Sequence, residues 1–188
     1  LAAEIDTPVD PRVSAMAAVL AAQYGTAARS VLFYGSCLRE QQLDGLMLDF
    51  YLIVSDYPAA YPGSWLAKAN ALIPPNVFPF AHEGLASKYA VLSEADFAAL
   101  NRDTASTVSV WARFSQPVRL VWQADEVARA RVLVAMAEAP ATLFRLAAPL
   151  SPSPAVLDIW RTGYARTYDC ELRAERAGRS GSIIDADP

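Results

Sequence analysis

Two neighbouring apolar runs dominate the hydrophobic pattern of the chain and are typical of buried strands. They cover residues 29–34 and 46–55, and each is short and rich in β-branched, aromatic and other apolar residues. In the second run, Leu48, Phe50, Leu52 and Val54 share one face, because side chains alternate along a strand. That face should lie in the core. Asp49 is on the opposite face, where we expect it to border a cleft.

The remaining pattern predicts further strands and several helices. Strands are expected at residues 77–80, 88–92 and 118–122, and the first two of these should join one sheet. Helices are expected at residues 13–23, 36–43, 65–72, from 93 onward, 125–137, 140–146 and 156–177, with a loop at 56–63 and a break at 151–154. A strand-rich front half before a helix-rich back half predicts an α+β fold. We place one domain at residues 1–122 and a helical part packed on it at 123–188.

The composition suits a folded domain and narrows its chemistry. The 188 residues are 54% hydrophobic and 19% charged, which allows a sizeable core. The formal net charge of −4 argues against a broad nucleic-acid-binding surface, so no nucleic-acid partner is expected. A single histidine argues against His-rich metal sites and a Ser-His-Asp hydrolase. The two distant cysteines, Cys37 and Cys170, fit a reducing, cytoplasmic or matrix-like compartment. We identify no signal peptide and no apolar run long enough to span a bilayer.

Gly35, Ser36 and Asp49 form a candidate site for a metal-bound triphosphate. Gly35-Ser36 ends the first predicted strand, and twelve residues separate Ser36 from Asp49. A glycine lets the backbone approach phosphate oxygens, and a hydroxyl and N–H groups at a helix start can donate hydrogen bonds to them. A strand carboxylate can bind Mg²⁺. The plainer alternatives are an ordinary Gly-Ser turn and an edge-strand Asp satisfied by N–H groups.

Four short blocks, in order along the chain, resemble a known enzyme group. They are Tyr34-Gly35-Ser36, Met47-Leu48-Asp49-Phe50, Lys88-Tyr89-Ala90-Val91-Leu92-Ser93, and Arg113 followed by Pro117-Val118. The first two resemble the DNA polymerase β-like nucleotidyltransferase superfamily. All four together are similar to the mitochondrial-type phosphatidate cytidylyltransferase family, the soluble CDP-diacylglycerol synthases.

This resemblance implies a fold, a reaction and a set of roles. The fold would be a nucleotidyltransferase-like mixed sheet flanked by helices. The reaction would convert CTP and phosphatidic acid to CDP-diacylglycerol and pyrophosphate with Mg²⁺, a step of phospholipid biosynthesis. Asp49 and Lys88 would be catalytic, and Asp49 would bind the metal. Gly35, Ser36, Lys88 and Arg113 would bind the nucleotide.

The chain departs from the superfamily at its second metal carboxylate. The superfamily usually carries that carboxylate two residues after the first, where this chain has Tyr51. Candidates for the missing ligand are Asp56, Asp44 and Glu83, of which Asp56 is preferred. The spacer between the Asp49 and Lys88 blocks is also shorter than the family implies.

The predicted C-terminal helix bears on membrane contact and on the competing functions. Arg161, Arg166, Arg173, Arg176 and Arg179 lie along or just beyond it, with Trp160, Tyr164 and Tyr168. A basic, aromatic helix can lie on an anionic membrane surface, such as an inner membrane. It can equally be a solvated helix packed on the domain. Two other functions remain open: nucleotidyl transfer to another small-molecule or protein acceptor, and non-catalytic nucleotide binding.

Overall fold

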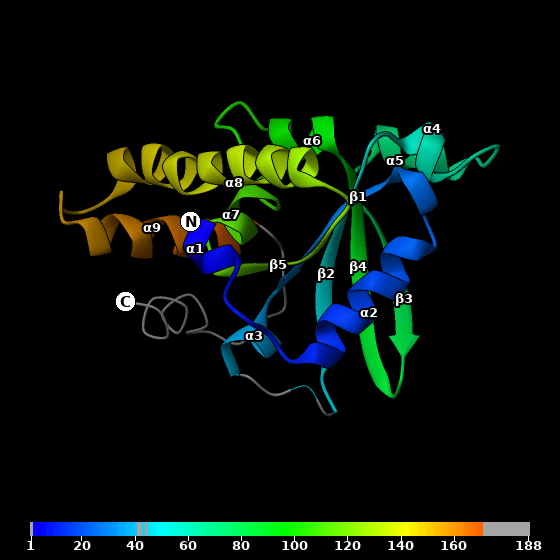
Figure 1. Ribbon diagram of the computed structural model, residues 1–188. Helices are drawn as coiled ribbons and strands as arrows, with labels where there is room; N and C mark the ends of the chain where they lie inside the picture. Colours follow the sequence, from blue (N-terminus) through cyan, green and yellow to red (C-terminus); the bar gives the residue numbers. More distant parts are fainter. Residues whose placement is uncertain (1, 41–42, 44, 171–188) are drawn as a thin grey trace. The chain divides into compact units, whose positions relative to one another are not determined.

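The computed structural model describes residues 2–40, 43 and 45–170 (Figure 1). The described helices are α1 Ala2–Ile5, α2 Pro11–Ala22, α3 Ser36–Glu40, α4 Tyr57–Ala60, α5 Leu66–Leu72, α6 Glu94–Leu100, α7 Trp111–Phe114, α8 Glu126–Ala147 and α9 Val156–Cys170, with short 3₁₀ turns at Gly25–Ala27 and Ala148–Leu150. The strands are β1 Ala28–Tyr34, β2 Met47–Val54, β3 Asn76–His82, β4 Leu85–Ser93 and β5 Val118–Gln123.

All five strands join one mixed sheet in the order β3-β4-β2-β1-β5. Strand β1 pairs antiparallel with both β2 and β5, β3 pairs antiparallel with β4, and β2 pairs parallel with β4. The end of β1 therefore lies at the same end of the sheet as the starts of β2, β4 and β5. The α+β class, with a mixed sheet flanked by helices, is confirmed.

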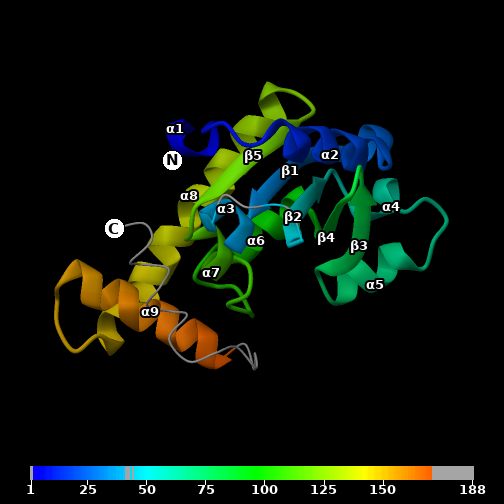
Figure 2. The same cartoon turned by 90° about the horizontal axis from the view of Figure 1, so that it is seen from below.

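The apolar face of β2 packs where its alternation predicts. Leu48, Phe50, Leu52 and Val54 are fully buried, and they belong to the cluster that contains the inner side of α2. Figure 2 shows α2 lying over this face of the sheet. Helix α2 forms here because Asp10 caps its start, Pro11 occupies its first turn, and its apolar residues recur at helical spacing. The opposite face of the sheet is also buried at Leu32, Ile53 and Leu92, so Asp49 lies in a largely apolar surface.

Helix α8 differs from the prediction of two helices separated at Pro140. It runs without interruption from Glu126 to Ala147, with Pro140 inside it. A buried stripe at helical spacing continues through the proline: Ala128, Val132, Ala135, Met136, Ala139, Leu143 and Ala147. Burial along this stripe outweighs the one backbone hydrogen bond that a proline removes. The predicted loop at 56–63 also proves to contain the short helix α4.

One stretch of the described chain is long and apolar enough to cross a membrane by length and composition alone. It covers Glu126–Leu150, has a mean hydropathy of 1.3, and 39% of its apolar window is buried. The sequence-based expectation of no such run was wrong because it divided the stretch at Pro140. A single helix of this kind is weak support for a membrane span, since the core helix of a soluble protein has the same properties.

The contacts divide the chain into two compact units. The first comprises residues 1–98 and 117–134, and the second comprises residues 99–116 and 135–188. The first unit contains the whole sheet. The second contains α7, the later part of α8, and α9, held together by contacts such as the hydrogen bond from Tyr164 Oη to the Ser115 carbonyl (2.6 Å). The predicted boundary after residue 122 stays a prediction.

Gly163 on α9 should be intolerant of a side chain. A Cβ there would lie 2.5 Å from Leu143 Cδ2 and 2.9 Å from Leu143 Cγ, on α8. We expect Gly163→Ala to lower the free energy of unfolding, because overpacking costs ~1–3 kcal/mol whereas the gain in helix propensity is at most ~1 kcal/mol. Chemical denaturation measures the change. In a Leu143→Ala background the loss should be smaller, because only the 3.2 Å contact with Ala147 Cβ remains; an equal loss in both backgrounds would contradict the packing explanation.

Candidate functional site

The turn after β1 brings its backbone unusually close to a carboxylate. Gly35 has φ +93°, a conformation that other residues rarely adopt. A Cβ at this position would lie 2.7 Å from Asp49 Oδ2. Both the backbone conformation and the available space therefore require glycine here. Ser36 follows as the first residue of α3, so its hydroxyl and the first N–H groups of the helix lie at the same turn.

The strand register places Asp49 between the end of β1 and Lys88. Asp49 pairs with Tyr34 on β1 and with Lys88 on β4. Lys88 Nζ lies 3.3 Å from Asp49 Oδ1, and the two side chains are 52% and 18% exposed, respectively. The ammonium therefore compensates a mostly buried carboxylate while remaining accessible to solvent. The structure thus brings together four predicted site residues: Gly35, Ser36, Asp49 and Lys88.

The same register aligns an aromatic pair that the sequence did not single out. The rings of Tyr34 and Tyr51 are 5.2 Å apart between centroids, on adjacent strands β1 and β2. Tyr51 occupies the position expected for a second carboxylate and is 2% exposed. It packs as a core residue rather than presenting a ligand. Alternation along β2 would have placed Tyr51 on the face of Asp49, but only the folded sheet identifies Tyr34 as its ring partner.

The side chains present suit a divalent ion only with the help of substrate oxygens. Among the described residues, no group of three or more His, Cys, Asp or Glu side chains could hold a metal ion. Asp49 is one oxygen ligand, and it lies so close to the Gly35 backbone that an added Cβ would be 2.7 Å from its Oδ2. Mg²⁺ is commonly held by one or two carboxylates together with substrate phosphates and water. The residues therefore fit a metal that arrives with a nucleotide, and they do not form a complete metal site of their own.

Asp56, the preferred second metal ligand, lies at the wrong end of the sheet. Val54 pairs with Ala28 at the start of β1, whereas Asp49 pairs with Tyr34 at its end. From Asp49 to Val54 alone, the strand extends roughly 17 Å, at about 3.3 Å per residue. Asp56 instead caps α4, accepting a hydrogen bond from the Ala59 N–H at 2.7 Å. The prediction that Asp49 and Asp56 share a metal was therefore wrong.

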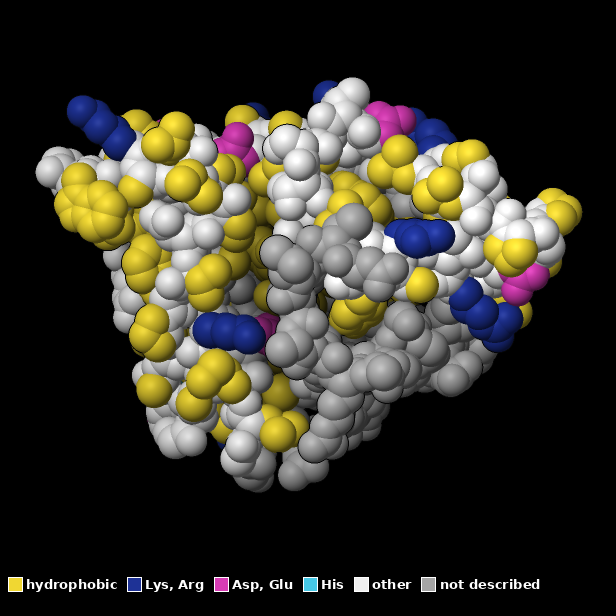
Figure 3. All heavy atoms as spheres, turned by 180° about the vertical axis from the view of Figure 1, so that it is seen from behind, with side chains coloured by type: hydrophobic (Ala, Val, Ile, Leu, Met, Phe, Trp, Pro, Cys, Tyr) yellow, Lys and Arg dark blue, Asp and Glu magenta, His cyan; other side chains and the backbone are white. Residues whose placement is uncertain are grey.

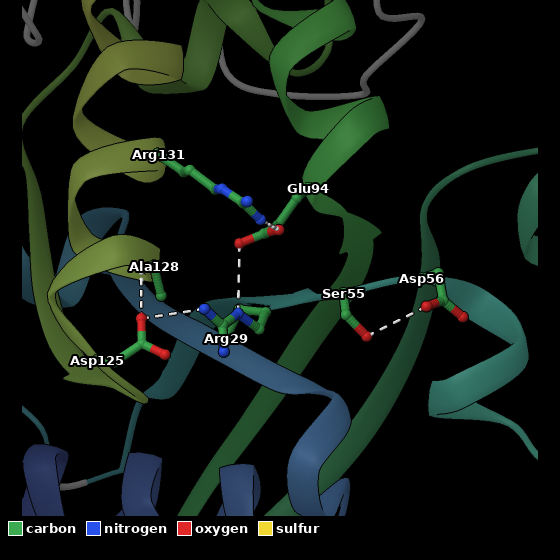
Figure 4. A network of polar contacts seen from close by, with 7 residues as sticks. All are labelled: Arg29, Ser55, Asp56, Glu94, Asp125, Ala128 and Arg131. Atoms are coloured by element: carbon green, nitrogen blue, oxygen red, sulfur yellow. Dashed lines mark hydrogen bonds and ion pairs between the residues drawn. The ribbon is translucent and has the colours of Figure 1, made fainter.

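Figure 4 shows Asp56 at the same end of the sheet as a separate ion-pair network. Arg29 Nη2 lies 3.0 Å from Asp125 Oδ1, and Arg29 Nε lies 3.4 Å from Glu94 Oε1. Glu94 also pairs with Arg131. The Ala128 N–H and then Arg29 lower the pKa of Asp125, the residue before α8. These contacts join β1, α6 and α8 and have a structural role.

Three further candidates, Asp44, Glu83 and Arg113, stay predictions. Asp44 lies outside the described residues. Glu83 is in the turn between β3 and β4 with φ 47°, and its side chain is 72% exposed beside His82. Arg113 lies on α7, in the second unit. Its role in nucleotide binding stays a prediction.

Comparison with known proteins gives a distant fold likeness. No protein-family model matches the sequence, and no curated protein matches it. The solved structure of a nucleotidyltransferase-like protein from Exiguobacterium sibiricum 255-15 aligns with a TM-score of 0.43 at 9% identity. The alignment covers 94% of this chain and 63% of that one, so this chain spans less than two thirds of the neighbour's length. A likeness of this degree assigns neither a family nor an activity.

Substituting Gly35 should be more costly than substituting a glycine in open space. Gly63 has a similar backbone conformation, φ +70°, and a Cβ added there would meet no other atom within 4 Å. We expect Gly63→Ala to lose ~1 kcal/mol from the backbone alone, and Gly35→Ala to lose ~1–3 kcal/mol more because of the clash with Asp49. Equilibrium unfolding measures both. The excess should disappear in an Asp49→Ala background, and its persistence there would show that Asp49 is not its cause.

Asp56→Ala tests the reassignment of Asp56 as a helix cap. Loss of the cap should lower the free energy of unfolding by ~0.5–2 kcal/mol. Binding of a metal–nucleotide complex to the folded protein, measured by calorimetry, should be unchanged. Weakened binding comparable to that of Asp49→Ala would restore Asp56 to the site.

Proposed function

We propose that this chain is a nucleotidyltransferase whose site is the Gly35-Ser36 turn, Asp49 and Lys88. One observation carries the proposal: the Asp49 carboxylate lies so close to the Gly35 backbone that no side chain fits between them. A glycine turn at the start of a helix, beside a carboxylate, suits a metal-bound triphosphate. The turn can approach phosphate oxygens closely, and the carboxylate can hold the associated cation.

The roles of the chain's own residues follow from this geometry. The Gly35-Ser36 backbone and the Ser36 hydroxyl would donate hydrogen bonds to phosphate oxygens. Lys88, half exposed and 3.3 Å from Asp49, would donate to the same triphosphate from the neighbouring strand. Asp49 would be the protein ligand of a magnesium ion. That ion, when bound, would offset the charge that develops on the phosphoryl oxygens during transfer.

For the substrates, we propose CTP and phosphatidic acid, yielding CDP-diacylglycerol and pyrophosphate. Support comes from the ordered blocks that include Gly35-Ser36, Asp49, Lys88 and Arg113. The attacking phosphate of phosphatidic acid is already ionised at neutral pH, so the reaction does not depend on a strong general base. This suits a site in which the carboxylate is paired with an ammonium rather than with a histidine.

A lipid acceptor requires contact with a membrane surface, and we propose peripheral association with an inner-membrane-type bilayer. Figure 3 shows hydrophobic side chains at the surface, interspersed with polar ones. In the first unit, Trp65, Leu72 and Ile73 are 74%, 80% and 74% exposed, and Lys68 lies among them on α5. Exposed Trp and Leu beside Lys are typical of helices that rest on anionic bilayers.

The C-terminal helix offers less to such a surface than its sequence indicates. Tyr164 is 4% exposed, and the Trp160 ring stacks on it at 5.9 Å. Arg173, Arg176 and Arg179 lie outside the described residues. We therefore propose that α5 contacts the membrane. Arg173, Arg176 and Arg179, which follow α9 in the sequence, would supply basic side chains to the same contact.

A second function is favoured by the ion pair itself. Because Lys88 already neutralises Asp49, the turn could bind a nucleotide without a metal and without transferring it. The same residues would then form a metal-independent phosphate-binding site. A third possibility, transfer to a different acceptor, differs from the first only in the substrates.

Asp49→Asn and metal removal should separate these functions. If the chain is a phosphatidate cytidylyltransferase, pyrophosphate release from CTP with phosphatidate-containing vesicles should require Mg²⁺. The rate should fall at least ~100-fold in Asp49→Asn, whereas that of the control variant Asp56→Asn should stay near wild type. Coupled colorimetric detection of pyrophosphate measures this rate. CTP binding that survives EDTA, with no pyrophosphate released for any acceptor, would instead support the binding protein. Turnover of ATP with another acceptor, but none with phosphatidate, would support nucleotidyl transfer and contradict phosphatidic acid as the acceptor.

A further inference from the structure

Exposed apolar side chains surround the Asp49–Lys88 pair on the outer part of the sheet. Pro79 of β3 pairs with Lys88 of β4, and Lys88 pairs with Asp49 of β2, so these three side chains share one face of the sheet. Val77 and Met47, on the same face, are 57% and 52% exposed. We call the exposed apolar residues of this region the β3–β4 face; they are Met47, Val77, Pro79, Ala81 and Ala86.

The charges on this face suit an anion attached to an apolar tail. Strands β2, β3 and β4 are described in full, and they contain one carboxylate, Asp49, and one ammonium, Lys88. Lys88 is 52% exposed and Asp49 only 18%, so a molecule that lies on the face contacts the ammonium first. With a cation bound to Asp49, the ammonium is left to pair with phosphate oxygens. The β3–β4 face thus has a cation at its inner edge and apolar surface beyond it.

The β3–β4 face follows directly on the exposed end of α5. Leu72 and Ile73, at this end, are 80% and 74% exposed, and β3 begins three residues after Ile73. From Ile73 to Pro79 the chain can extend at most about 21 Å. Exposed apolar side chains therefore lead over a short distance from the helix that we propose for membrane contact to the strand beside Lys88. A tail whose head is held at Lys88 can lie along this path.

Pro79 makes the face of β3, rather than its edge, the surface for a partner. Strand β3 is at the edge of the sheet, where another strand could add to it. Pro79 is the middle residue of this strand and has no backbone N–H to donate to such a neighbour. An added peptide strand or a second copy paired edge to edge is therefore disfavoured, whereas a tail on the apolar face needs no backbone hydrogen bonds.

We infer that the β3–β4 face binds the apolar tail of an acceptor whose phosphate lies beside Lys88. The ligand class is a phosphate monoester that carries an alkyl or acyl tail. The inference rests on the proposed function in naming this ligand the acceptor, whereas its binding requires no transfer. Nucleotide and acceptor then approach Asp49 from opposite sides, because β1 with the Gly35-Ser36 turn and β4 flank β2 on its two sides.

Butyl, hexyl and octyl phosphate test the tail on the full chain without a membrane, at concentrations too low for micelles and with Mg²⁺ present. In NMR titrations the Kd should fall about fourfold for each added pair of methylenes, as when each methylene loses about half of its exposure to water. 1-Octanol, which lacks the phosphate, should bind at least tenfold more weakly than octyl phosphate. A Kd that does not depend on tail length would overturn the apolar surface, and equal binding of 1-octanol would overturn the role of Lys88.

Val77→Gln and Val127→Gln are a matched pair of variants, because the two valines are 57% and 56% exposed and lie on β3 and α8. Val77→Gln should raise the Kd of octyl phosphate about fourfold and that of butyl phosphate less than twofold, since the shorter tail covers less of the face. Val127→Gln should change neither Kd. Each variant's amide spectrum establishes that it is folded. Equal effects of the two variants, or none in folded Val77→Gln, would overturn the assignment of the face.

Lys88→Gln tests the position of the phosphate separately from that of the tail. It should raise the Kd of all three alkyl phosphates by the same factor, about tenfold, because it removes the contact with the head and leaves the apolar surface intact. The dependence of the Kd on tail length should therefore persist. An unchanged Kd for butyl phosphate would overturn the placement of the phosphate beside Lys88.

Pyrophosphate release from CTP separates this inference from the proposed function. With octyl phosphate as acceptor, Val77→Gln should raise KM about fourfold and leave kcat unchanged. Binding that depends on tail length, with no pyrophosphate released for any acceptor, would support the surface and contradict nucleotidyl transfer. Transfer to butyl and octyl phosphate with equal KM would support nucleotidyl transfer and overturn the surface.

Discussion

The register between β1 and β2 is the constraint on which the candidate site depends. Pairing of Tyr34 with Asp49 places the carboxylate beside the turn that ends β1, and Gly35 is the residue type that this contact permits. A shift of one residue would turn Asp49 into the apolar core and bring Leu48 or Phe50 to the other face. Burial of the Leu48–Val54 face against α2 therefore fixes the position of the polar group on the opposite face.

A carboxylate in a sheet that is buried on both faces needs compensation. Asp49 is 18% exposed, and Lys88 supplies the opposite charge from the parallel neighbour β4. The same ion pair is compatible with two functions of the site. An ammonium beside the carboxylate can assist a metal-bound triphosphate or can take the place of the metal. Tyr51, buried against Tyr34, stands where a second carboxylate would lie, which makes substrate oxygens essential to any metal bound here.

The two ends of the sheet differ in role: one carries the candidate site, and the other carries a structural ion-pair network. At the end that carries Gly35 and Asp49, polar groups remain accessible beside a turn. At the other end, Arg29, Glu94, Asp125 and Arg131 pair with one another and tie α6 and α8 to β1. Asp56 belongs to that structural end because β2 carries the chain from one end of the strands to the other after Asp49. A motif spacing of seven residues is short in sequence but long in space when the residues are extended.

Alternation and helical spacing are local patterns, so the amino-acid order was enough to predict the strands, the fold class and the candidate pairing of a Gly-Ser turn with a strand Asp. It also identified Lys88 through the third of the four ordered blocks. Which carboxylates share a site depends on strand direction and register, and so Asp56 was misplaced. The prediction divided helix α8 at Pro140, because the buried stripe that stabilises the continuous helix forms only when the chain packs. The contact between Gly35 and Asp49 and the exposed apolar face beside Lys88 became visible only in the folded chain, since both arise between residues distant in sequence.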